Sequence, residues 1–199
     1  MSGQGVFNRY FAVVPIVAFA AASVSAQIQS VTPYFAVVSG DDAMLRCGNE
    51  DMLYPIAKLP KGQIVRVDGE GAGWARVGYP IGIAAFVGAD SLQLDTGGKM
   101  ATVTKATKLK AANLTTGFKG SWKDVLDTAV PAGTKLAIID AEPASDGRGN
   151  SAYKVAPPEA ARAYIQIASI RKASSEEINS FMASQAGKPA AVTPTDKPL

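Results

Sequence analysis

The sequence of 199 residues contains no histidine and only one cysteine, Cys47. Without histidine there is no histidine general base, no histidine metal ligand and no Ser-His or Cys-His nucleophile pair. A single sulfur forms neither an intramolecular disulfide nor a four-thiolate zinc or iron-sulfur site. Composition therefore excludes most of the common catalytic constellations, and we expect no cofactor and no bound metal.

The sequence also has little excess charge. Its 20 Lys and Arg residues against 17 Asp and Glu residues give a formal net charge of +3, which falls to +2 if Arg9 is removed with the N-terminal segment. Such an excess is too small for bulk attraction to nucleic acid or to an anionic membrane. We therefore expect no nucleic-acid partner.

Residues 1–26 have the pattern of a secretory signal peptide. Arg9 precedes an apolar run from Tyr10 to Ala22, and Val24-Ser25-Ala26 is a small-residue cleavage site. The run contains Pro15 and is shorter than the ~20 apolar residues that a bilayer-spanning helix needs. We expect cleavage after Ala26, a secreted or periplasmic protein, and no transmembrane segment in the mature chain.

From Tyr34 onward, short runs of β-branched and aromatic residues are separated by Gly, Pro and Asp. This is the pattern of closely spaced strands and turns. The segment 63–67 alternates polar and apolar residues, and the glycine-rich segment 69–73 is predicted to be the hairpin loop before a strand at Trp74. No long helical period appears before the C-terminal tail, so the predicted fold class is all-β.

The second half of the sequence repeats the order of the first. The segment 59–63 corresponds to 130–134 at an offset of 71, and Phe86-Val87 corresponds to Tyr164-Ile165 at an offset of 78. At the front of the units, Leu45-Arg46 corresponds to Leu109-Lys110 at an offset of 64. The offset grows through insertions around 113–122 and in 140–150, in turn-rich segments where a duplicated fold tolerates them. We interpret the sequence as a tandem duplication.

Four blocks of the first unit follow one another in a characteristic order. They are Leu45-Arg46-Cys47-Gly48, the segment 56–67, Gly73-Trp74-Ala75-Arg76-Val77 and Ala85-Phe86-Val87. This order resembles the bacterial SH3 domain family, whose pattern is an Arg-x-Gly turn, an apolar strand, a Gly-Trp and a final Gly-Trp-Val. Ala85-Phe86 replaces the last Gly-Trp, and the second unit has Ser151-Ala152 in place of the first one.

The resemblance implies a five-stranded, strongly bent barrel for each unit. Physical reasoning agrees, because short strands with short hairpins bury one face only when the sheet closes on itself. We therefore expect two tandem small SH3-like barrels, a bacterial SH3-like domain at 33–95 and a divergent second domain at 99–172. Domains of ~60 residues are marginally stable alone, so we expect the barrels to pack together across the connection 95–98.

Aromatic residues of the first unit are the candidate ligand-binding residues: Trp74, Tyr79, Tyr54, Phe86 and Tyr34. Aromatic clefts of eukaryotic SH3 domains take proline-rich peptides, and the resemblance implies cell-wall or envelope partners for a bacterial member. The alternative for Trp74 is a plug of the barrel core, because aromatic side chains contribute large buried areas to small cores.

A candidate basic patch lies between residues 99 and 123, a stretch without any acidic residue. Its lysines are Lys99, Lys105, Lys108, Lys110, Lys119 and Lys123. An anionic wall polymer would be attracted to such a patch, and salt would screen the attraction. The alternative is a solvated strand face, for which Lys108 and Lys110 have the expected two-residue spacing.

The acidic residues do not form a recognisable site. The loop 140–150 contains Asp140, Glu142 and Asp146, but its spacing does not match a calcium-binding loop, and we expect a mobile hairpin tip. Other acids, which a glycosidase pair would require, lie in predicted turns: Asp41, Asp42, Glu50, Asp51 and Glu70. We therefore expect no enzymatic activity.

The single cysteine, Cys47, is expected to be a small buried side chain. The alternative is intermolecular disulfide pairing in an oxidising compartment.

The C-terminal segment 173–199 changes character. Ser174 and Glu177 have the spacing of a capping box, and Ile178, Phe181 and Met182 follow on one helical face. We predict a short amphipathic helix that docks on the second barrel, or alternatively serves as a partner motif. Beyond Gly187 the composition of Ala, Pro, Thr and Lys predicts a disordered tail.

Together these patterns predict an exported, non-catalytic binding protein. Its tandem barrels would bind a component of the cell envelope, either wall glycopeptide or another envelope protein. Two alternatives remain open: a structural scaffold in which one barrel mediates assembly, and the targeting subunit of a cell-wall hydrolase system whose catalytic centre lies on a separate chain.

Overall fold

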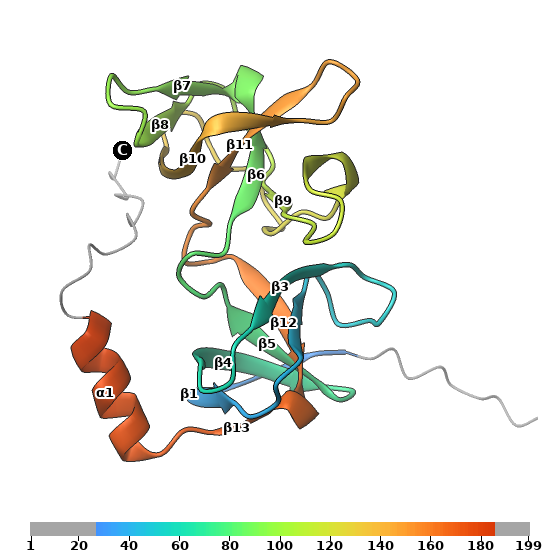
Figure 1. Ribbon diagram of the computed structural model, residues 1–199, viewed down its shortest axis with the longest axis vertical. Coiled ribbons are helices and arrows are strands. Elements are labelled where there is room, and N and C mark those ends of the chain that lie inside the picture. The colour runs from blue at the N-terminus through green and yellow to red at the C-terminus, as the bar shows by residue number, and fades with distance from the viewer. Residues whose placement is uncertain (1–26, 186–199) are drawn as a thin grey trace, which may run out of the picture.

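The computed structural model describes residues 27–185 (Figure 1). The predicted signal peptide and the tail beyond Gln185 lie outside the described residues. The described chain forms two antiparallel sheets followed by one short helix, so the all-β prediction is confirmed. Neither sheet closes into a barrel by strand pairing.

The first sheet has seven strands in the order β13-β1-β4-β5-β12-β2-β3. Their bounds are β1 Gln29–Val38, β2 Ala43–Arg46, β3 Pro55–Leu59, β4 Ile64–Gly71, β5 Trp74–Gly78, β12 Arg162–Gln166 and β13 Ile170–Lys172. The predicted hairpin loop is shorter than expected, because only Ala72 and Gly73 separate β4 from β5. Both have positive φ, +48° and +84°, as a two-residue turn between twisted strands requires.

The second sheet has six strands in the order β7-β8-β10-β11-β6-β9. Their bounds are β6 Ala85–Gly88, β7 Leu92–Leu94, β8 Met100–Val103, β9 Lys110–Ala111, β10 Lys135–Ser145 and β11 Ser151–Val155, and single 3-10 turns lie at η1 Ala89–Ser91, η2 Phe118–Gly120 and η3 Ile167–Ser169. The insertion at 140–150 extends the β10–β11 hairpin, so about half of it is strand and not loop.

The two halves of the chain exchange their last strands. β6 and β7, which end the first half, pair with β11, β9 and β8 of the second. β12 and β13, which end the second half, pair with β5, β2 and β1 of the first. In Figure 1 the green and orange segments cross between the sheets in opposite directions. Each sheet therefore contains strands from both predicted units, 33–95 and 99–172.

The strand registers agree with the sequence offset of 78. In the second sheet Ala85 pairs with Val155. In the first sheet Ala163 pairs with Val77. Ala163 lies 78 positions after Ala85, and Val155 lies 78 positions after Val77. The outer strands are equivalent with a smaller offset on one side: Leu92 pairs with Val103, and Ile170, 78 positions after Leu92, pairs with Val38, which lies 65 positions before Val103. The sheets are thus equivalent, and each is completed by the final strands of the opposite half.

Buried side chains of both halves form one hydrophobic cluster, which includes Leu45, Val67, Val87, Leu136 and Ile165. The expectation that the units pack together agrees with this continuity. A small sheet of short strands contributes few core residues by itself. Exchange of strands places apolar side chains of each half in the interior of the other.

Helix α1, Ser175–Gln185, has the predicted capping box. The Ser174 backbone N–H donates to Glu177 Oε2 at 2.8 Å, and the Glu177 N–H donates to Ser174 Oγ at 3.2 Å. The Phe181 ring lies 5.7 Å from the ring of Phe35 on β1. The prediction that the helix docks on the second unit is therefore wrong. Because of the strand exchange, β13 pairs with β1 at the edge of the first sheet. The helix begins three residues after β13 ends, so it contacts the first sheet.

Candidate functional site

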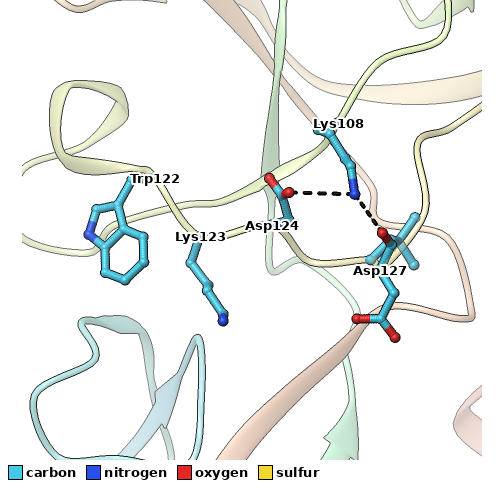
Figure 2. A pocket seen from close by; sticks show the side chains of 6 residues that line it. Lys108, Trp122, Lys123, Asp124 and Asp127 are labelled. Carbon is cyan, nitrogen blue, oxygen red and sulfur yellow. Dashed lines mark hydrogen bonds and ion pairs between the residues drawn. The ribbon is translucent and has the colours of Figure 1, made fainter.

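A hollow of about 310 Å³ opens next to β9 (Figure 2). It is lined by Lys108, Trp122, Lys123, Asp124, Leu126 and Asp127. Lys108 precedes β9, Trp122 is the last residue of the insertion at 113–122, and the other four residues come from the chain that follows it. Backbone hydrogen bonds hold these two segments side by side. The Val125 N–H donates to the Leu109 carbonyl oxygen, and the Ala111 N–H donates to the Lys123 carbonyl oxygen.

Two lysines determine the charge distribution of the hollow. Lys108 Nζ donates to the Asp127 carbonyl oxygen at 2.6 Å and lies 3.6 Å from Asp124 Oδ2. Lys110 Nζ lies 2.5 Å from Asp124 Oδ1 and donates to the Trp122 carbonyl oxygen at 3.2 Å. Two ammonium groups therefore compensate the half-buried Asp124 carboxylate, and they also fix the backbone on both sides of Lys123.

Trp122 forms an exposed aromatic rim. Its side chain is 58% exposed, and its ring makes an edge contact with Tyr54, with 5.7 Å between ring centroids. Figure 2 shows the Trp122 and Lys123 side chains extending in the same direction. Among the described residues Lys123 has no ion-pair partner. An exposed indole beside a free ammonium group is suited to bind a ligand with an apolar face and an acidic or carbonyl group.

Tyr54 connects this site to the other sheet. Its hydroxyl donates to the Ala111 carbonyl oxygen at 2.9 Å and accepts from the Lys123 backbone N–H at 3.1 Å. Burial raises the pKa of Tyr54 from its ordinary value of 10.0 to about 12, so the hydroxyl stays protonated and can keep donating even in alkaline solution. Leu114 also donates its N–H to the Pro55 carbonyl oxygen at 2.9 Å. The first half of the chain thus supports a site formed by the second.

Two buried groups lie near Tyr54. Cys47 is 4% exposed, which confirms the prediction of a buried thiol, and burial raises its pKa. Its sulfur is therefore not presented for pairing with another chain. The Tyr79 hydroxyl is also buried, its pKa is raised by burial, and it has no hydrogen-bond partner within residues 27–185.

The structure distributes the five predicted aromatic residues over three places. Trp74 and Phe86 are core residues, 7% and 2% exposed, and burial of Trp74 agrees with its alternative interpretation as a plug. Tyr34 lies on β1, where its hydroxyl donates to Glu70 at 2.5 Å and the Lys172 ammonium lies 5.3 Å from its ring. Only Tyr54 and Tyr79 lie near the junction of the two sheets.

The six predicted lysines are not one free cationic surface. Lys105 pairs with Asp90 at 2.6 Å, and Lys108 and Lys110 share Asp124. The remaining three, Lys99, Lys119 and Lys123, form no ion pair in the described part of the chain. Lys119 and Lys123 belong to the same segment as Trp122, whereas Lys99 lies in the turn between β7 and β8.

Trp122 was not among the residues singled out from the sequence. A signal was present, because it is one of only two tryptophans and lies at the end of the insertion at 113–122, which has no counterpart in the first unit. A large apolar residue in an inserted surface loop has no core to fill. The family pattern drew attention instead to Trp74, whose position is internal.

Within residues 27–185, no group of three or more Cys, Asp or Glu residues is arranged to hold a metal ion. In the inserted hairpin, the Asp146 carboxylate accepts from the backbone N–H groups of Arg148 and Asn150 at 2.7 and 3.1 Å, which makes it part of a turn. No helix in that range is long and apolar enough to cross a membrane.

Comparisons with protein-family models, curated proteins and solved structures found no match for this chain.

Proposed function

We propose that this protein is an exported, non-catalytic binding protein, and that its two strand-exchanged units are divergent SH3-like barrels that bind a cell-envelope component. The leader pattern of residues 1–26 supports export. The ordered blocks of the first unit and the matching registers of the two sheets support the tandem architecture. Peptidoglycan is the preferred ligand and an envelope protein is the second possibility.

The exposed Trp122 beside the hollow carries this proposal. Its indole offers a flat apolar surface to a sugar ring or a peptide. Lys123 offers an unpaired cation, and the Asp127 side chain at the other end of the hollow offers a carboxylate. A wall glycopeptide carries sugar rings, carboxylates and amines, so each of these groups has a partner on it.

Sedimentation with purified wall sacculi tests the proposal. We expect the protein to sediment with sacculi and Trp122→Ala to bind at least about tenfold more weakly, because a tryptophan that becomes buried against its ligand commonly contributes more than about 1.4 kcal/mol. Ile139→Ala is the matched control, since Ile139 is an exposed apolar residue, 44% accessible, outside the hollow.

Equal binding of the Trp122→Ala variant and the native protein would reject the hollow as the site. If the protein does not sediment but one envelope protein co-purifies in a Trp122-dependent manner, the partner is that protein and not the wall. Absence of both would reject the envelope-binding function.

A further inference from the structure

The exchanged segment at the C-terminal end of the second half makes its strand pairings with the first half. We call residues 162–185 the arm; it contains β12, η3, β13 and α1. β12 pairs with β5 and β2, and β13 pairs with β1. Within the described residues the arm forms no strand pairing with the rest of the second half, residues 99–161.

The surface that receives the arm also supplies polar contacts. Asp68 Oδ2 accepts from Arg162 Nε at 2.5 Å. The Ile167 N–H donates to the Gly73 carbonyl oxygen at 2.8 Å, and the Ser169 carbonyl oxygen accepts from the Ser39 N–H at 2.9 Å. None of these contacts involves the hinge at 156–161, which joins the arm to β11.

The hinge is short and rich in proline. Its sequence is Ala-Pro-Pro-Glu-Ala-Ala, and its counterpart at the offset of 78, residues 78–83, is Gly-Tyr-Pro-Ile-Gly-Ile. The Ala161 N–H donates to the Pro158 carbonyl oxygen at 2.9 Å, and the equivalent Ile83 N–H donates to that of Pro80 at 3.2 Å. Proline fixes its own φ at about −65° and disfavours the helical conformation for the residue before it, and the hinge leads from β11 to a strand, β12, that pairs with β5 and β2 and not with β11.

We propose that the surface formed by β1, β2 and β5 also receives the arm of a second copy of this chain, and that two copies form a closed dimer by reciprocal exchange. The arm is already an exchanged element within one chain, so donation to another copy preserves the pairings of β12 and β13 and the Asp68–Arg162 ion pair. Reciprocal exchange satisfies both receiving surfaces at once, as a closed two-fold assembly requires.

Monomer and dimer would contain the same strand pairings, so chain concentration decides between them. A short linker holds the arm near its own receiving surface at an effective concentration of about a millimolar. Dilute folding therefore favours the monomer, and folding of concentrated chains favours the dimer. Interconversion requires β12 and β13 to unpair, so a dimer formed in this way persists after dilution.

Two cysteine variants distinguish this exchange from surface association. Val77 and Ala163 are facing residues of β5 and β12, and Cys47→Ala removes the native thiol. One copy carries Val77→Cys and the other carries Ala163→Cys. We expect joint refolding at near-millimolar concentration, followed by oxidation, to produce a species of twice the mass in which a disulfide joins the two different copies.

Refolding below micromolar concentration, or mixing the copies after each has folded, should reduce this product by at least about tenfold if the effective concentration is in the millimolar range. A single chain with both cysteines is the folding control, because it should form the disulfide internally. A species of twice the mass that lacks the disulfide would overturn the proposal. A second variant lacks residues 157–159 and therefore has a shorter hinge. If neither the original pair nor this variant forms a species of twice the mass at high concentration, while the control chain forms its disulfide, the proposal is also overturned.

Discussion

Arg162 and Asp68 are 94 residues apart in the sequence, yet Arg162 Nε lies 2.5 Å from Asp68 Oδ2. Arg76 Nε approaches the other carboxylate oxygen at 2.7 Å. Asp68 is on β4, Arg76 on β5 and Arg162 on the exchanged strand β12. One largely buried carboxylate thus connects a strand from the end of the chain to the central hairpin of the first half.

Asp68→Asn should lower the free energy of unfolding by about 2 kcal/mol, because it leaves two partly buried guanidinium groups without their counter-charge. Urea denaturation followed by tryptophan fluorescence measures the change. Asp42→Asn is the control, since the Asp42–Lys58 pair is exposed to solvent and such pairs contribute little. Equal stability of the native protein and the Asp68 variant would contradict a stabilising role for the ion pair.

The same carboxylate predicts a dependence of stability on pH. Burial by itself raises the pKa of Asp68, but the hydrogen bonds from Arg76 and Arg162 outweigh it and lower the pKa below the ordinary value of 3.8. The contribution of Asp68 is thus complete above that ordinary value and is lost as pH falls through the lower pKa of the folded state. Unfolding free energies measured from neutral pH into this acid range should fall less steeply for Asp68→Asn. A parallel decline in both proteins would contradict the assignment.

Tyr79→Phe should leave the protein equally stable or stabilise it by up to about 1 kcal/mol, because it removes a buried hydroxyl that has no partner among the described residues. Tyr54→Phe is the matched comparison. It removes two hydrogen bonds and should cost about 1–2 kcal/mol. Thermal unfolding of both variants tests the contrast, and a larger loss for Tyr79→Phe would mean that its hydroxyl has a partner in solution.

Cleavage of the connection between the halves should not separate them. A protease site inserted into 96–98, between β7 and β8, would produce two fragments, each of which still supplies strands to both sheets. We expect them to elute together in size-exclusion chromatography under native conditions and to separate in denaturant. Separation without denaturant would contradict the exchanged topology.

Features that depend on neighbouring residues could be read from the sequence. Alternating side chains and turn residues indicate the strand at 63–67 and the tight turn before Trp74, because strand periodicity and positive φ are local requirements. The reciprocal bonds of Ser174 and Glu177 are equally local. The offsets of 64, 71 and 78 indicated the equivalence of the two halves, and the strand registers agree with them.

The candidate site could be predicted only in part. The lysines from Lys99 to Lys123 were visible as a charge pattern, but the pairing of Lys105 with Asp90 and of Lys108 and Lys110 with Asp124 depends on contacts across loops. Trp74 and Trp122 are the same residue type, and only packing places the first in the interior and the second at the surface. An aromatic pattern therefore does not by itself distinguish a core plug from a binding residue.

By itself, the sequence determined an all-β chain, its turns and helix cap, and two units of equivalent order, because these follow from local periodicity and internal repetition. It did not determine which half receives which final strand. Equivalent strands β6 and β12 have the same order and spacing relative to their hairpins, so either could pair with β5 or β11. Only the tertiary structure made that choice, since the hinge paths, the Asp68–Arg162 ion pair and the shared core are formed by residues far apart in the chain.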